Sequence, residues 1–199
     1  MVEHRPWIGP KSKLGISGQQ IAIVGYSHHR NPDHVDGDRF TIGVVRKFLS
    51  CELERNALFS RVPGYFGYES RKDRKEFWNR VWFFNFVPEC IGTDEQKYAT
   101  AKSDLVERAK QRFKRILQED PIQKVFVFTT KGWRACPCTD EEKAGKDCAS
   151  LGPEFKKVTW GTYTIGRRKV LAFGFRHPQG ADKRLMTAAV SRALLRKSD

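Results

Sequence analysis

The sequence has no hydrophobic run that approaches the roughly 20 apolar residues of a membrane-spanning helix. It also has no basic start followed by a long apolar stretch, so we expect no signal peptide. No internal repeat is found. These absences argue against a membrane protein and against a repeat architecture, and we expect a cytoplasmic protein that associates with the nucleoid.

Cysteine is scarce and its spacing is not typical of a zinc site. The chain has five cysteines, an odd number that argues against a disulfide framework in a protein without an export signal. Cys136 and Cys138 are separated by one residue, and Cys148 follows only after nine more, which is no standard zinc spacing. We therefore expect free thiols, no metal and no cofactor. A zinc-stabilised nucleic-acid protein is the alternative that these cysteines leave open.

Positive charge is abundant. Lys and Arg total 37 against 23 Asp and Glu, which gives a net charge of +14. Basic residues alternate with aromatic residues at 71–82 and 167–176. Because Lys and Arg neutralise phosphates and release condensed counterions, nucleic acid is the leading partner, and a merely solvated basic face is the weaker interpretation.

The order of apolar segments predicts an α/β protein. With 199 residues, 39% of them hydrophobic, the chain suits one domain with a sizeable core. Residues 1–19 are predicted to form a flexible arm, and residues 20–199 a single domain that we expect to be monomeric. Buried strands are predicted at 20–25, 81–87 and 124–130, near 158–163, and from residue 169. Helices are predicted after Asp38, at 72–80, after a capping box of Thr93 and Gln96, and through 186–194.

Strands that alternate with helices and are continuously apolar are typical of a parallel sheet covered on both faces. The prediction is a three-layer α/β/α sandwich with a short, mostly parallel central sheet. Residues 60–68, with Pro63 and two glycines among aromatics, are interpreted as an insertion or lid, and residues 134–157 as a long polar loop.

Three polar residues lie at or near the ends of these strands. Ser27 follows the first strand, Asn85 lies inside the second, and His177 follows the last. Parallel strands bring their carboxyl ends to one edge of the sheet, where open α/β folds place their active sites. Pro178 restricts His177 to extended backbone, so the direction of its ring is fixed. Asn85 stands between two phenylalanines and, if buried, must be hydrogen-bonded.

These motifs occur in an order that resembles the uracil-DNA glycosylase superfamily. The strand that ends in Gly25-Tyr26-Ser27-His28-His29 is similar to its first motif, and Phe40 stands where its base-stacking aromatic falls. The strand carrying Asn85 is similar to its base-recognition strand, and His177-Pro178-Gln179-Gly180 to its closing motif. The resemblance extends from residue 20 to the end of the chain.

The resemblance implies a monofunctional DNA glycosylase that uses water and no cofactor. Such an enzyme flips uracil or a related deaminated base out of double- or single-stranded DNA and hydrolyses its N-glycosidic bond. Phe40, Asn85, Gly25 and Tyr26 would bind the base. His177, as a neutral ring, would donate a hydrogen bond to the base oxygen on which negative charge develops.

The sequence departs from the best-known branch at Ser27, where that branch has an aspartate. Because a serine cannot act as a comparable base, the water would be held by Ser27 as a hydrogen-bonding group, by a backbone carbonyl, or by His28 or His29. This departure favours the alternative function, a non-catalytic DNA- or RNA-binding protein on the same fold. Exposed loop residues are an equally simple interpretation of the two histidines.

The segment after the last strand resembles the family's DNA-probing loop. Arg176, Lys183 and Arg184 are predicted to contact phosphates. Leu185 would wedge into the emptied base position or, the interpretation that we favour, begin the apolar stripe of the last helix.

Overall fold

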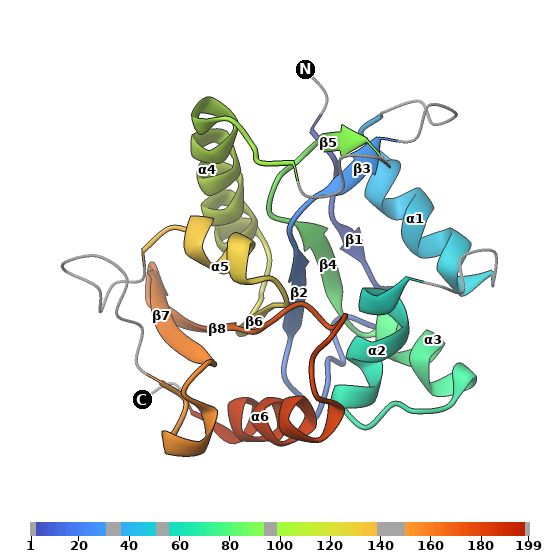
Figure 1. The fold of residues 1–199 in the computed structure, drawn as a ribbon, viewed down its shortest axis with the longest axis vertical. Helices are drawn as coiled ribbons and strands as arrows, with labels where there is room; N and C mark the ends of the chain where they lie inside the picture. The colour runs from blue at the N-terminus through green and yellow to red at the C-terminus, as the bar shows by residue number, and fades with distance from the viewer. Residues whose placement is uncertain (1–2, 31–36, 51–55, 94–98, 139–149, 198–199) are drawn as a thin grey trace.

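The computed structural model describes residues 3–30, 37–50, 56–93, 99–138 and 150–197, and a six-stranded sheet forms its centre (Figure 1). In spatial order, the strands are β1 (Trp7–Ile8), β4 (Trp82–Asn85), β2 (Ile21–Gly25), β6 (Lys124–Val127), β8 (Arg168–Gly174) and β7 (Thr159–Ile165). The four central strands are parallel, whereas β1 and β7 pair antiparallel at the two edges. The prediction of a mostly parallel sheet in an α/β protein is confirmed.

Helices cover both faces of this sheet. They are α1 (Phe40–Leu49), α2 (Ala57–Tyr65), α3 (Arg71–Asn79), α4 (Ser103–Glu119), α5 (Thr130–Ala135) and α6 (Lys183–Leu195), with a short 3-10 helix, η1, at Pro153–Phe155. In Figure 1, α4 and α5 lie to the left of β2 and α1, α2 and α3 to its right. None of the helices in the described ranges is long and apolar enough to cross a bilayer.

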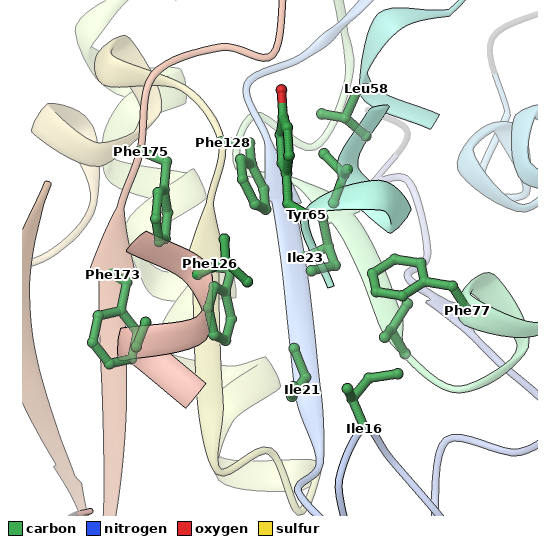
Figure 2. Packing of buried hydrophobic residues seen from close by; sticks show 14 of the residues in the cluster. Ile16, Ile21, Ile23, Leu58, Tyr65, Phe77, Phe126, Phe128, Phe173 and Phe175 are labelled. Atoms are coloured by element: carbon green, nitrogen blue, oxygen red, sulfur yellow. The ribbon is translucent and has the colours of Figure 1, made fainter. Parts of the chain in front are cut away.

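Each face of the sheet has its own hydrophobic core, because neighbouring residues of a strand point to opposite faces. Ile21 and Ile23 of β2 pack in the first core, with side chains of α1, α2, α3 and α6. Ala22 and Val24 pack in the second core, with side chains of α4. Figure 2 shows part of the first core, where aromatic rings from β6, β8 and the residues after them lie beside α2. Two packed faces explain why the central positions of these strands are apolar, while polar residues such as Lys124 and Asn85 stand at the strand ends.

The segment expected to be an insertion or lid is a helix. Asn56 caps α2 by accepting hydrogen bonds from the backbone N–H groups of Leu58 and Phe59. Pro63 lies inside α2, and a proline there has no N–H for the carbonyl four residues earlier. That carbonyl belongs to Phe59, and the indole Nε1–H of Trp78 donates to it at 3.1 Å. A side chain of α3 therefore replaces the backbone hydrogen bond that the proline removes.

The predicted flexible arm is also wrong for residues 3–19, which are part of the fold. Strand β1 adds to the edge of the sheet, and the indole Nε1–H of Trp7 donates to the carbonyl of Trp78 at 2.8 Å. His4 is buried. A Cβ atom at Gly9 would lie 2.4 Å from the carbonyl oxygen of Asn79, so this close approach requires glycine.

Other boundaries differ from the predictions. The polar loop after β2 contains β3 (His28–Arg30), which pairs in parallel with β5 (Cys90–Thr93) in a small second sheet. Thr93 ends β5, Gln96 lies outside the described residues, and α4 begins at Ser103 with Lys102 as its N-cap. The N-cap of α1 is Arg39, which makes no side-chain capping hydrogen bond, and Asp38 forms an ion pair with Arg5. The short helix α5 was not predicted.

Candidate active site

The ends of β2, β4, β6 and β8 meet at the carboxyl edge of the sheet. Gly25 and Asn85 are direct neighbours in the register of β2 and β4. The ladder continues past the strand ends, because Phe86 N–H donates to Gly25 O at 2.9 Å and Phe175 N–H to Val127 O at 2.8 Å. His177 follows Phe175 by two residues, so the parallel arrangement brings Gly25, Asn85 and His177 to one edge, as predicted from the motif order.

Asn85 and Gly25 form the centre of this edge. Asn85 is only 6% exposed, and its side chain crosses the backbone of Gly25, where a Cβ atom would lie 2.2 Å from its Oδ1. Within the described residues, the amide of Asn85 has no hydrogen-bond partner. A buried amide is normally paired within the protein. Its amide atoms, however, are not fully buried, so water or a ligand can pair with them in place of the hydrogen bond expected within the protein.

Arg112, a residue of α4, restrains the backbone at Asn85. The guanidinium of this residue of α4 donates to the carbonyl oxygen of Asn85 at 3.0 Å and to that of His4 at 2.5 Å. Arg112 is 2% exposed, and burial lowers its pKa to about 10, against the opposing effect of Glu3 at 3.5 Å. It is still charged at neutral pH, and its fixed hydrogen bonds restrain the end of β4.

The ring of His177 is oriented by its own loop. Its Nδ1 accepts a hydrogen bond from the backbone N–H of Gln179 at 3.2 Å. A neutral ring that accepts at Nδ1 carries its proton on Nε2. Partial desolvation and the positive charge of Arg61 lower the pKa of this exposed histidine below its usual value, so the neutral form dominates at pH 7. Arg61 also donates to the carbonyl of Pro178 at 3.0 Å and thereby holds the loop.

Two residues of α2 lie on the same side of the sheet. The Cδ1 atom of Leu58 is 3.6 Å from the Cβ position of Gly25. Tyr65 packs beside Phe128, and Figure 2 shows its hydroxyl oxygen directed toward the end of the sheet at which β2 finishes. The hydroxyl has no hydrogen-bond partner among the described residues, and burial raises its pKa, so it stays protonated at neutral pH.

Phe40 belongs to an aromatic cluster beside this edge. Its ring stacks on His4, with centroids 5.2 Å apart, and meets the edge of His28 at 5.0 Å. The Nε2 of His28 lies 3.0 Å from the hydroxyl oxygen of Thr41. Phe40 and His28 are therefore brought together, with His4 stacked against the Phe40 ring.

The rest of the first motif divides between the two faces. Ser27 is half-buried after the end of β2, and its hydroxyl has no hydrogen bond to the described part of the chain. Tyr26 points to the α4 and α5 side, where its hydroxyl accepts from Ala101 N–H at 3.4 Å and the Lys131 ammonium lies 4.8 Å from its ring centroid. The fold does not bring Tyr26 to Asn85. His29 is exposed.

The predicted DNA-probing loop leads into α6. Arg176 and Arg184 are exposed, and Lys183 forms an ion pair with Glu69 at 3.0 Å. Leu185 is 60% exposed and donates its N–H to the capping carboxylate of Asp182. The interpretation that Leu185 begins the buried stripe of α6 is wrong, since that stripe begins at Met186.

The cysteines do not assemble a site in the part of the chain that is described. Cys136 is buried and Cys138 exposed, while Cys148 lies outside the described residues. Over those residues, no group of three His, Cys, Asp or Glu side chains is placed to hold a metal ion.

Arg112, Arg61 and Tyr65 were missed by the sequence reasoning. Arg112 carried a usable signal, because it lies on the same helical face as the buried residues Leu105 and Ala109. An arginine on an apolar stripe requires buried partners. Arg61 and Tyr65 lie in the segment interpreted as an insertion or lid, where Pro63 and two glycines are not typical of a helix.

The chain's likeness to known proteins adds no further evidence on these residues. No protein-family model matches the sequence, and a search of curated proteins finds no match either.

Proposed function

We propose that this protein is a DNA glycosylase that excises uracil or a related deaminated base. The observation that carries the proposal is the buried amide of Asn85, which lies against Gly25 without a partner among the described residues. An amide offers one acceptor and two donor hydrogens, the groups that can pair with the edge of a base. A base inside a duplex cannot reach such a buried group, so the nucleotide would have to be flipped out.

His177 supplies the second part of the chemistry. Its Nδ1 accepts from Gln179 N–H, which leaves the Nε2–H as a donor at the same sheet edge. When the glycosidic C–N bond breaks, the electron pair goes to the base and the sugar becomes an oxocarbenium-like cation. A donor held in advance at the base oxygen stabilises that negative charge, and this kind of contact is typically worth a factor of about 10² to 10³ in rate.

Water then adds to the sugar and loses its proton to solvent. We assign Ser27 to the positioning of that water, because its hydroxyl follows β2 directly and has no partner in the described residues. The hydroxyl holds the water without acting as its base. Tyr65, protonated and directed toward the same edge, is the other hydroxyl that fits this task.

The surface around the edge suits a phosphate backbone. Arg176, Lys183 and Arg184 are exposed near His177 in the sequence, and the chain carries a net charge of +14. Leu185 presents an apolar side chain at the start of α6, where it can fill the gap left by a flipped base.

The test is base release from defined oligonucleotides under single-turnover conditions. Duplexes with one uracil, hypoxanthine or xanthine, and a matched duplex with cytosine, are incubated with excess protein and then treated with alkali. We expect strand breakage at the deaminated base and none at cytosine. In Asn85→Ala we expect discrimination between bases to fall by about 1–3 kcal/mol, the value of a paired hydrogen-bond contact to a base.

Gly25→Ala provides an independent test of the same geometry. Its methyl group would occupy the place of the Asn85 Oδ1 atom, so the amide must move, and we expect the same loss of discrimination. If no base is released from any of the three substrates while DNA binding is normal, the protein is a non-catalytic nucleic-acid-binding module, the alternative that Ser27 favours.

A further inference from the structure

A pocket of about 370 Å³ opens beside the His177 loop. Its walls come from α2, the residues up to and within α3, and the start of α6. The lining residues that matter here are Arg61, Tyr65, Glu69, Arg74 and Lys183. Neither Gly25, Asn85 nor His177 lines it, so it is a separate cavity from the edge of the sheet where the base is proposed to bind.

Three cations and one carboxylate face this pocket. Lys183 Nζ lies 3.0 Å from the carboxylate of Glu69, and Arg74 donates from Nε to the backbone carbonyl of the same residue at 3.0 Å. Arg61 uses one amino group for the carbonyl of Pro178. Each contact fixes a cation with part of its donors, because an arginine has five N–H groups and a lysine ammonium three. The pocket keeps a net positive charge and free donors.

We propose that this pocket binds a phosphate group of the nucleic-acid backbone. Naming DNA as its source rests on the proposed function. Two guanidinium groups and an ammonium around one cavity match the shape and charge of a phosphodiester, and arginine recognises phosphate with two parallel hydrogen bonds.

The connection to His177 makes the pocket useful for excision. Arg61 lines the pocket and also holds the carbonyl of Pro178, the residue that follows the catalytic histidine. Tyr65 lines the pocket while its hydroxyl is directed to the end of β2. A bound phosphate would therefore fix the DNA strand against the two elements that border the base site, and the exposed Lys183 and Arg184 continue the basic surface onto α6.

The test measures binding of a uracil-free duplex by fluorescence anisotropy over a salt series. In Arg74→Gln we expect about tenfold weaker binding at low salt and a slope of log K against log salt that is smaller by about 1. Glu69→Gln removes the pocket's carboxylate, so we expect tighter binding and a steeper slope. Lys114→Gln is the matched control, because it removes one exposed cation from α4 on the other side of the sheet.

Equal effects of Arg74→Gln and Lys114→Gln on the slope would overturn the proposal. Thermal unfolding of each variant shows whether α3 is still formed, and Glu69→Gln tests the pocket with a change of opposite sign. Inorganic phosphate is titrated at constant ionic strength to separate the two sources of phosphate. Thermal stabilisation that Arg74→Gln abolishes, without any change in the DNA slope, would assign the pocket to a free anion and overturn the backbone assignment.

These measurements use DNA without a target base, so they are independent of excision. If the protein releases a base but Arg74→Gln and Lys114→Gln change the salt slope equally, the phosphate pocket alone is refuted. If Arg74→Gln lowers the salt slope as expected but the protein releases no base, the proposed function alone is refuted.

Discussion

Lys124 and Asn85 lie at opposite ends of the central sheet and differ in how their polar side chains are paired. At the amino end, Lys124 is 5% exposed, and its ammonium donates to the carbonyl oxygens of Ala193, Leu194 and Arg196 at 3.0, 2.5 and 2.7 Å. At the carboxyl end, Asn85 is 6% exposed and its amide has no partner within the described chain. The two side chains are therefore almost equally buried and differ in their hydrogen-bond partners.

The same contrast extends to neighbouring side chains. Near the amino end, Arg168 donates to the carbonyl oxygens of Ile122 and Leu117. Near the carboxyl end, the buried Tyr65 keeps an unpaired hydroxyl among the residues described. Paired buried groups such as the Lys124 ammonium stabilise the protein itself, whereas the side-chain polar atoms of Asn85 and Tyr65 keep enough exposure to pair with water or with a ligand. We therefore expect Lys124 to contribute to stability and, under the proposed function, Asn85 to contribute to binding.

Removal of His177 is the strongest test of the carboxyl end. We expect His177→Ala to lower the single-turnover rate of base release by about 10² to 10³, as for the loss of one preorganised donor. The midpoint of urea unfolding should stay close to that of the wild type, because the exposed ring makes one local hydrogen bond with its own loop. Salt-dependent DNA binding should persist.

Lys114→Gln serves as the control for activity, since it changes one exposed residue of α4. A large drop in the midpoint of urea unfolding in His177→Ala would mean that His177 serves folding. The comparison between Lys124 and the carboxyl end would then fail.

Removal of Lys124 tests the amino end. Lys124→Met leaves the last carbonyl groups of α6 without their donor, and we expect a loss of about 1–3 kcal/mol in the free energy of unfolding measured with urea. Base release per folded molecule should be unchanged. Asn85→Ala is the matched change at the other end, and its cost should stay below about 1 kcal/mol because no protein hydrogen bond is lost. Equal costs for the two variants would contradict the comparison.

The parallel core of the fold was predictable because its signals are local. Near-continuous apolar runs predicted β2, β4, β6 and β8, since the central residues of a strand packed on both faces are apolar. The α2 helix was missed because Pro63 normally breaks a helix, and its repair by Trp78 is a contact between distant residues that local patterns do not contain. Strand β1 was missed for the same reason.

The site was predictable in part. The order of strand ends placed Gly25, Asn85 and His177 at one edge. The sequence did not reveal which buried polar groups would be paired, because Arg112 reaches Asn85 and Lys124 reaches α6 only in the folded chain. The resemblance implied that Tyr26 binds the base, but Tyr26 follows the end of β2 and its side chain lies against Ala101 and Lys131.

The pH dependence of base release is the smallest expected effect and tests how His177 acts. Its pKa lies below the usual 6.5, so the ring is neutral at pH 7, with Nδ1 accepting from Gln179 N–H. Protonation places a hydrogen on Nδ1, removes that hydrogen bond and releases the ring from its orientation. We therefore expect a single-turnover rate that is constant from about pH 8 to 7 and falls by up to about tenfold per unit well below the pKa.

DNA binding measured at each pH separates this loss from weaker association. Because the folded protein binds this proton less tightly than the unfolded chain, stability also falls slightly as the pH drops below 6.5, and unfolding at the lowest pH must be checked. A rate that rises as the pH is lowered would show that the imidazolium is the active form. The carboxyl end would then act through charge on His177, and the hydrogen bond from Gln179 would have to break before catalysis.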